Sequence, residues 1–333
     1  MTDVARLAGV SQKTVSRVVN GSDHVSEDVR RRVLTAIDEL GFRPNSAARA
    51  LANQRSGALG IITPATTLYG PSAQLLSLEQ AVWEAGLSVV ISSVRGGSPS
   101  HLAAAVRRVL DSGVDGLLIG SSPDDGGLTA EMLDGLPALF IGDPPPPGLA
   151  VPAVVTDQQA GARAATEHLL ALGHATVHHI AGPTVWHSAR SRQEAWRSAL
   201  EQAGAPVPDP VEGDWSARSG YDAAQRLLSR HDGGDVTALF VANDSMAIGA
   251  LRALAEAGRR VPDDVCLVGF DDVPEAEFLP VPLTTLRQDF TGMSTRAVAE
   301  LSRAIAGAPV PARIPNRPEL IVRASSTPRR SAR

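Results

Sequence analysis

The sequence contains a single cysteine and no long hydrophobic run. Cys266 cannot form a disulfide within the chain, and its surroundings, VCLVGF, predict an inert thiol in a buried strand rather than a nucleophile. No apolar stretch approaches the ~20 residues that cross a bilayer, and the first residues, MTDVARLAGV, have no hydrophobic secretory core. We therefore expect a protein that stays in the cytoplasm and contacts no membrane.

Motifs that hold phosphate or metal, or that activate a nucleophile, are also missing from the sequence. There is no GxxxxGK[ST] phosphate loop, no GxSxG elbow, no HExxH motif and no CxxC pair. His178 and His179 are adjacent in a predicted strand, so their side chains point to opposite faces and do not share a metal. The sequence thus predicts neither an enzyme nor a cofactor or metal site.

Composition and charge describe a globular protein with one basic end. The chain of 333 residues exceeds the ~150 typical of one domain, and its 43% hydrophobic and 20% charged residues exclude wholesale disorder. Residues 1–55 hold nine Lys and Arg against six Asp and Glu, whereas the remainder has a net charge of −8. Such asymmetry is expected when only one end of a chain meets a polyanion.

The basic end predicts three short helices with a tight turn between the first two. The first covers residues 3–8 and ends at Gly9, the second begins at the N-cap Ser11, and the third begins at the N-cap Ser26. Apolar residues at helical spacing form a shared core: Val4, Ala5, Ala8, Val15, Val18, Val29, Val33, Ile37 and Leu40. Polar residues face outward from the second helix: Gln12, Lys13, Thr14, Ser16, Arg17 and Asn20. This pattern is a helix-turn-helix unit whose second helix can enter a DNA groove.

The segment GFRPNSAARALA favours DNA binding over the alternative, a helix face that is merely solvated. Pro44 ends the preceding element, Asn45 can cap, and residues 46–52 predict a helix of barely two turns with an exposed Leu51. Such a helix is too short to be stable alone in water. A marginal helix with small residues such as Ala48 and a leucine at its tip fits insertion into the minor groove.

These segments carry a resemblance to a known family. VARLAGVSQKTVSRVVNG, followed by HVSEDVRRRVLTAIDELGFRPNSAARAL, resembles the DNA-binding headpiece and hinge of the LacI/GalR family of bacterial repressors. The likeness continues through EHLLALGH, SARSRQEAW, EGDWSARSG, VANDSMAIGALRAL and VGFDDVPEAEFLPVPLTTLRQDF. It implies base-edge contacts at Gln12, Lys13 and Arg17, and hinge contacts at Asn45, Ala48 and the intercalating Leu51. It also implies phosphate contacts at Ser11, Thr14, Ser16, Asn20 and His24.

The start of the chain departs from the family pattern. Family members usually carry several residues before the Asp-Val-Ala motif, among them a threonine that caps the first helix and touches phosphate. Only Met1 and Thr2 precede Asp3 here. Two interpretations stay open: either this start is too late, or Thr2 does the work of that threonine poorly.

From residue 57 onward, short apolar runs alternate with amphipathic stretches. The runs are ALGIIT, SVVISS, GLLIG, ALFIG, TVHHIAG, ALFVAN and VCLVGF. Helices between them close on glycine at four places: Gly86, Gly113, Gly173 and Gly258. Repeated β-α units form parallel sheets covered on both faces, and about 270 residues exceed one core, so two α/β lobes are expected. The resemblance implies a periplasmic-binding-protein-like (type I) arrangement, with chain crossings between the lobes near Thr156, Leu286 and Asn316.

The expected organisation has four parts. They are a helix-turn-helix headpiece (1–43), a hinge helix and linker (44–56), a two-lobed effector-binding and dimerisation domain (57–326) and a tail (327–333). The lobe that the chain enters first, the near lobe, comprises about 57–156 and 288–316. The far lobe comprises about 157–286 and 317–326.

Polar side chains are expected at the cleft between the lobes, because ligands bind beyond the carboxyl ends of parallel strands. Asn243 and Asp271 directly follow apolar runs, and Arg192 and Trp215 lie on adjacent loops. A sugar needs donors and acceptors for its hydroxyl groups and an aromatic ring for its C–H face, which these residue types supply. The resemblance implies effector contacts at these four positions and also at Gln288, Asp124, Leu68 and Pro71.

Each of these residues also has a purely structural interpretation. Arg192 could be a surface charge on a helix, Asn243 and Asp271 could be N-caps, and Trp215 could be core packing. Their co-occurrence at strand ends favours a site. Trp196, which lies at helical spacing within its helix, is assigned to the core instead.

Together these features predict a homodimeric transcriptional repressor of sugar-utilisation genes that binds near-palindromic double-stranded operator DNA. Its effector would be a small sugar, with a galactoside as one candidate. The segment FIGDPPPPG leaves the sugar's identity open, because Gly142 stands about where the family often has an acidic residue and Asp143 is one step displaced.

Two alternatives and the oligomeric state complete these expectations. A purine- or other metabolite-responsive repressor of the same family is the alternative, and a solute-binding protein would carry a signal peptide in place of the headpiece. The segment ELIVRASSTPRRSAR has no leucine heptads, so we expect a dimer rather than a tetramer.

Overall fold

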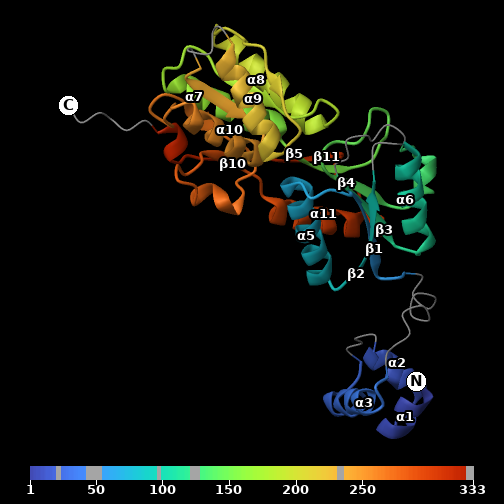
Figure 1. The fold of residues 1–333 in the computed structure, drawn as a ribbon. Helices are drawn as coiled ribbons and strands as arrows, with labels where there is room; N and C mark the ends of the chain where they lie inside the picture. Colours follow the sequence, from blue (N-terminus) through green and yellow to red (C-terminus); the bar gives the residue numbers. More distant parts are fainter. Residues whose placement is uncertain (20–23, 43–54, 96–98, 121–127, 231–235, 328–333) are drawn as a thin grey trace. The chain divides into compact units, whose positions relative to one another are not determined.

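A computed structural model describes residues 1–19, 24–42, 55–95, 99–120, 128–230 and 236–327. The chain divides into two compact units, Met1–Gly57 and Ala58–Arg333 (Figure 1). No helix within the described ranges is both long enough and apolar enough to span a bilayer.

The unit Met1–Gly57 contains the three predicted helices. They are α1 (Thr2–Ala8), α2 (Gln12–Val19) and α3 (Glu27–Glu39). Gly9 follows α1 with a φ of 64°, a left-handed conformation that glycine adopts without steric cost and that turns the chain into α2. The apolar residues of the three helices form one buried cluster around Val4, Val15 and Val33. This arrangement confirms the helix-turn-helix unit.

Two details of α3 differ from the prediction. Ser26 has the extended backbone of an N-cap, but its side chain accepts no capping hydrogen bond. Leu40, predicted to be buried, is 47% exposed, because α3 ends one residue earlier and Gly41 turns the chain with a positive φ. Phe42 takes the expected place of Leu40: its N–H donates to the Ile37 carbonyl at 2.9 Å and it packs against the cluster.

The near lobe is built on a six-stranded parallel sheet. In spatial order its strands are β11 (Arg313–Asn316), β5 (Ala153–Thr156), β4 (Ala138–Gly142), β3 (Gly116–Gly120), β1 (Ala58–Pro64) and β2 (Ser88–Val94). Ile61 and Leu118 pack toward α5 (Tyr69–Glu84) and α11 (Phe290–Ile305). Ile62 and Ile119 pack toward α6 (Pro99–Asp111) on the opposite face. Figure 1 shows this arrangement, in which both faces are covered as a parallel sheet requires.

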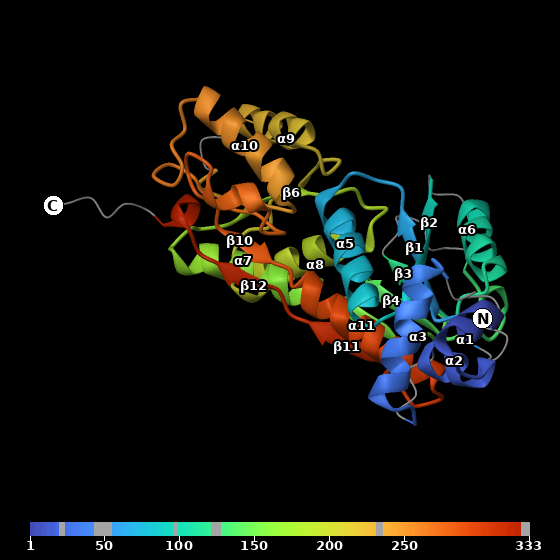
Figure 2. The same ribbon diagram turned by 90° about the horizontal axis from the view of Figure 1, so that it is seen from below.

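The far lobe is built on a four-stranded parallel sheet. In spatial order its strands are β7 (Val211–Glu212), β6 (His178–Ala181), β8 (Ala238–Val241) and β9 (Cys266–Val268). One face packs against α7 (Gln158–Ala171) and α8 (His187–Gln202), and the other against α9 (Ala217–Ser229) and α10 (Asp244–Glu256) (Figure 2). Trp196 is fully buried, which confirms its assignment to the core. Cys266 is buried too, and burial raises the pKa of its thiol to about 11, so it is unreactive.

The chain passes between the two sheets after β5, after β10 (Thr285–Arg287) and after β11. Strand β10 pairs antiparallel with β12 (Glu319–Ile321), and single bridges connect this pair to the end of β9. Short 3-10 helices complete the described elements: η1 (Glu131–Leu133), η3 (Pro274–Glu277) and η4 (Ala324–Ser326). The four glycines expected to close helices all have positive φ. The predicted fold class, two α/β lobes after a helical headpiece, is confirmed.

Candidate functional site

A pocket opens between the two lobes at the carboxyl ends of their strands. Residues after strands of both sheets line it, as the strand-end rule requires. Seven predicted effector residues lie in its wall: Arg192, Trp215, Asn243, Asp271, Gln288, Leu68 and Pro71. Asp124 lies outside the described residues.

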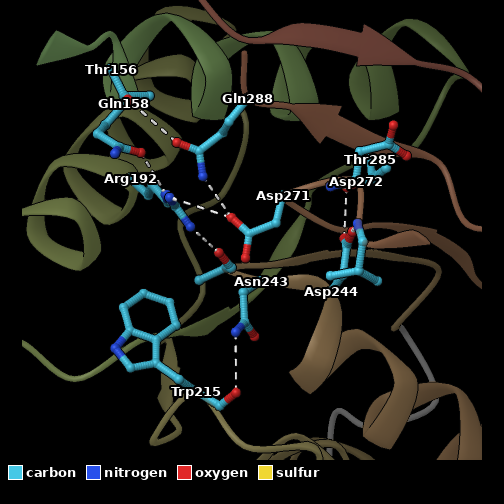
Figure 3. A network of polar contacts seen from close by, with 12 residues as sticks. Thr156, Gln158, Arg192, Trp215, Asn243, Asp244, Asp271, Asp272, Thr285 and Gln288 are labelled. Atoms are coloured by element: carbon cyan, nitrogen blue, oxygen red, sulfur yellow. Dashed lines mark hydrogen bonds and ion pairs between the residues drawn. The ribbon is translucent and has the colours of Figure 1, made fainter. Parts of the chain in front are cut away.

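Arg192 lies on α8 and is 4% exposed, so the alternative of a surface charge is wrong. Its Nε donates to Oε1 of Gln158 at 2.8 Å, and its Nη1 donates to the Ala242 carbonyl. Its Nη2 lies 4.0 Å from Oδ1 of Asp271, and its guanidinium stacks 3.5 Å from the centre of the Phe270 ring. These contacts hold the guanidinium in one orientation at the pocket wall (Figure 3).

Asp271 follows β9 and is not the N-cap of a helix; the next element, η3, starts after Val273. Its Oδ1 accepts a hydrogen bond of 2.7 Å from Nε2 of Gln288, and Oε1 of Gln288 accepts one of 3.2 Å from the Thr156 hydroxyl. Burial raises the pKa of Asp271 to about 6, although Arg192 and Gln288 favour the charged carboxylate. The structure thus brings Arg192, Asp271 and Gln288 together, as predicted.

Asn243 is both a helix cap and a pocket residue. Its Oδ1 accepts from the Met246 N–H at 2.9 Å, which caps α10, and its Nδ2 donates to the Trp215 carbonyl at 3.1 Å. The side-chain amide retains one further donor and one further acceptor position. The structural alternative for this residue is therefore correct, and it does not exclude a ligand contact.

Trp215 forms an apolar wall beside these polar groups. It has a φ of 74° and is buried, and its ring lies against Gly182, where a Cβ atom would overlap the indole. Trp186 packs edge-on against it, with ring centroids 6.5 Å apart. Pocket residues of the near lobe include the apolar Leu68, Tyr69 and Pro71. The pocket therefore offers hydrogen bonds on one side and apolar contact on the other.

A second carboxylate lies buried beneath the pocket. Oδ1 of Asp244, the first residue of α10, accepts from the Thr285 hydroxyl at 2.6 Å, and its Oδ2 accepts from the Val273 N–H at 3.0 Å. Burial, followed by the neighbouring Asp271, raises the pKa of Asp244 to about 7. Among the described residues, no group of three or more His, Cys, Asp or Glu side chains is placed to hold a metal ion.

The second candidate surface is α2 of the headpiece. Gln12, Lys13 and Arg17 are exposed on it, and Thr14 and Ser16 are half-buried. Ser11 caps the helix as predicted, since its Oγ accepts from the Thr14 N–H at 3.1 Å. His24 is exposed in the loop before α3. The other predicted DNA contacts, Asn20, Asn45, Ala48 and Leu51, lie outside the described residues, and so does the predicted hinge helix.

Thr2 does not cap α1. The N-cap position belongs to Met1, which makes no side-chain capping bond, and Thr2 lies within the helix. The Thr2 hydroxyl instead accepts a hydrogen bond of 2.6 Å from Nε2 of Gln12. This contact ties α1 to the start of α2.

Comparison with known proteins identifies the chain's family. Residues 1–45 match the lacI family of bacterial regulatory proteins, and residues 166–326 match the periplasmic binding protein-like domain. The lactose operon repressor of Escherichia coli (strain K12) is 38% identical over 303 residues, which cover 90% of this chain and 82% of that protein. The chain belongs to the LacI family.

Further relatives agree with this assignment. The ribose operon repressor of Escherichia coli (strain K12) is 33% identical over 299 residues, which cover 86% of this chain and 87% of that protein. A crystal structure of the lac repressor dimer bound to operator and the anti-inducer ONPF matches with a TM-score of 0.87 at 35% identity. The match covers 97% of this chain and 98% of that chain. This LacI-family regulator thus has the family's DNA-binding headpiece and two-lobed domain, as its motifs predicted.

Pocket residues of this LacI-family regulator that were not among the predicted contacts include Trp186 and Asp143. Trp186 is followed by His187 just before the SARSRQEAW segment, and Asp143 follows β4. Asp143 is buried and its Oδ1 has no hydrogen-bond partner among the described residues, although Nδ1 of His187 lies 3.5 Å away. The displaced acid of FIGDPPPPG was a visible signal for Asp143, whereas the loop before α8 carried no periodic pattern.

Proposed function

We propose that this LacI-family regulator is a homodimeric transcriptional repressor of sugar-utilisation genes, and that a small sugar bound between its lobes controls its hold on operator DNA. The observation that carries the sugar assignment is the make-up of the pocket. The indole of Trp215 adjoins the buried, hydrogen-bonding side chains of Arg192 and Asp271. Two relatives, named as repressors of the lactose and ribose operons, support this ligand class, and a galactoside is one candidate.

In this proposal the sugar's hydroxyl groups bind Arg192, Asn243, Asp271 and Gln288, and its C–H face lies on Trp215. Nε and Nη1 of Arg192 are used by protein partners, which leaves donors on Nη2 for the sugar. Leu68 and Pro71 contact the sugar from the near lobe, with Asp124 as a further proposed contact.

The DNA-binding roles follow from the exposed face of α2. Gln12, Lys13 and Arg17 would reach base edges in the major groove. The phosphate contacts would be Ser11, Thr14, Ser16, Asn20 and His24. Asn45, Ala48 and Leu51 would act in the minor groove, with Leu51 between base steps. Support comes from the exposure of Ser11, Gln12, Lys13, Arg17 and His24, and from the operator-bound structure of the related lac repressor.

The proposed mechanism couples the two sites through the lobes. A sugar that binds one arrangement of the lobes more tightly shifts the population toward it, and the shift changes how the paired hinge segments meet the operator. Each protomer would read one half-site of a near-palindrome, which fits the dimer recorded for the related repressor. The protein would act in the cytoplasm, where its DNA lies, and would bind its sugar without chemical change.

Titration calorimetry and operator binding test this proposal. Purified protein is titrated with lactose, galactose and ribose, and separately with palindromic fragments taken from upstream of its own gene at low and at moderate salt. We expect heat with at least one sugar, and operator affinity that falls with rising salt because phosphate contacts release counterions. Protein that binds no sugar and ignores every fragment even at low salt would refute the proposal.

A further inference from the structure

The turn that presents Asp271 to the pocket has an unusual backbone at two successive residues. Asp271 has a φ of 119° and Asp272 a φ of 56°, a region that residues other than glycine rarely adopt. Hydrogen bonds from backbone N–H groups hold both ends of the turn: the Asp271 N–H donates to the Leu286 carbonyl, and the Val273 N–H donates to the carboxylate Oδ2 of Asp244. Such conformations persist only where the surroundings over-determine them.

The side chain of Asp272 supplies a further restraint. Asp271 lines the pocket, whereas the Asp272 carboxylate, 8% exposed, lies between two arginines. Nη1 of Arg323 donates to its Oδ1 at 2.7 Å, and Nε of Arg287 donates to its Oδ2 at 2.6 Å. Charge-assisted bonds of this length are the strong ones, and here they hold both oxygens of one carboxylate.

The two arginines lie on two different segments, one of which also contains a pocket residue. Arg287 is the last residue of β10 and directly precedes Gln288, the partner of Asp271. Arg323 follows β12, and its Nη1 also donates to the Leu283 carbonyl at 2.9 Å. The Asp272 carboxylate therefore joins the 271–272 turn to β10 and to the segment after β12.

We infer that Asp272 is a positioning residue of the effector site: clamped by Arg287 and Arg323, it holds the turn so that the Asp271 carboxylate faces the sugar. The inference rests on the proposed function, because it concerns how the same pocket binds its ligand. Without the clamp, the turn relaxes and the Asp271 carboxylate leaves Gln288 and Arg192. Sugar affinity then falls although every proposed sugar-contacting side chain is still present.

The chain offers a matched control for a merely structural role. Glu300 on α11 is also a buried carboxylate between two arginines, with a side chain 4% exposed. Nε of Arg296 lies 2.9 Å from its Oε1, and Nη1 of Arg303 donates to its Oε2 at 3.0 Å. Glu300→Gln therefore removes the same kind of charge pairing as Asp272→Asn, but away from the pocket.

A first test needs no ligand. The titration of the Asp271 carboxyl is followed by carbon NMR, with its resonance assigned from its absence in Asp271→Asn. Burial sets its raised pKa of about 6, so the pKa of a carboxyl that swings into solvent falls toward the ordinary value of 3.8. We expect that fall in Asp272→Asn and no change in Glu300→Gln. An Asp271 carboxyl that titrates at about 6 in both variants would overturn the inference.

The second test uses the sugars as probes. Calorimetry with lactose, galactose and ribose should show a dissociation constant raised by about tenfold or more in Asp272→Asn and unchanged in Glu300→Gln, even where both variants lose thermal stability. Arg287→Gln removes only the half-exposed arm of the clamp and should give a smaller rise in the same direction, which covers failure of Asp272→Asn to fold. Equal losses of sugar affinity in Asp272→Asn and Glu300→Gln would show that the clamp contributes only to the stability of the fold, and would contradict the inference. If no sugar binds the unaltered protein, the proposed ligand class fails, while the carboxyl titration still decides on the clamp.

Discussion

The headpiece and the effector pocket differ in whether their polar side chains are exposed or are held by other protein groups. On α2, Lys13 and Arg17 are exposed and make no hydrogen bond or ion pair with the described residues. In the pocket, Arg192 and Asp271 are buried and already bonded to protein groups. One surface leaves its charges in water, and the other holds them in fixed positions.

The difference follows from what each surface is proposed to bind. DNA is a long polyanion, so exposed cations that shed counterions on docking give affinity without prior order. A small sugar offers few contacts, so each polar group must be oriented in advance, and an unpaired buried group would cost about 1–3 kcal/mol. Substitutions in the pocket should therefore act nearly all-or-none, whereas substitutions on α2 should act by degrees.

The largest effect is expected from Asp271→Ala. The change removes a buried charged partner of Gln288 and leaves Arg192 without its nearest carboxylate, so sugar affinity should fall by more than about 100-fold. Operator affinity without sugar should stay within about twofold, because the headpiece is a separate compact unit. Calorimetry and operator anisotropy measure the two quantities, and a variant whose operator binding still responds to sugar would remove Asp271 from the site.

A smaller effect, on operator affinity instead of sugar affinity, is expected from Leu51→Ala. If Leu51 enters the minor groove, its loss should weaken operator binding by on the order of tenfold, since insertion of an apolar wedge stabilises the bent DNA. Sugar affinity should be unchanged. The same anisotropy and calorimetry apply, and unaltered operator affinity would exclude the proposed role of this residue.

Lys13→Gln should change the base preference of the headpiece at a single operator position. If Lys13 contacts a base edge, its substitution should reduce the binding free-energy difference between the preferred base and the other bases at one operator position by about 1–3 kcal/mol. Arg31→Gln on α3, where Arg31 pairs with Asp28 at 3.0 Å, is the control and should alter no base preference. Binding to a library of single-position operator variants measures both, and a uniform loss with Lys13→Gln would make it a phosphate contact instead.

The last prediction concerns stability and pH at Asp244 rather than ligand affinity. Its pKa of about 7 in the folded protein lies above the ordinary value of 3.8, so folding favours its protonated form. Its stability contribution is therefore fully present below about pH 4 and is lost as pH rises through about 7. Between about pH 4 and pH 7, the melting temperature of the unaltered protein should therefore fall relative to that of Asp244→Asn. A difference that is flat from pH 4 to 8 would show that Asp244 titrates normally.

Much of the fold could be predicted from the sequence because its signals are local. Apolar runs between glycines mark the strands, and the spacing of Val4, Val15 and Val33 marks the helical core. Leu40 shows the limit: the helical periodicity includes Leu40, but α3 ends at Glu39, and only the packing shows that Phe42 takes its place.

The pocket shows a second limit. Asn243 and Asp271 could be placed because they directly follow strands, yet the alternatives of cap and contact were not exclusive for Asn243. The approach of Asp143 to His187 depends on how the two lobes meet, which no local pattern encodes. The roles assigned to individual contact residues, and the residue ranges assigned to the lobes and hinge, remain proposals.

The central claim is that sugar and operator act on one conformational equilibrium, and linkage tests it most directly. Operator affinity is measured with and without a saturating sugar found by calorimetry, and sugar affinity is measured with and without saturating operator. The account predicts that both affinities change by the same factor, as thermodynamic reciprocity requires of coupled sites. Sugar and operator that bind tightly but leave each other's affinity unchanged would contradict it.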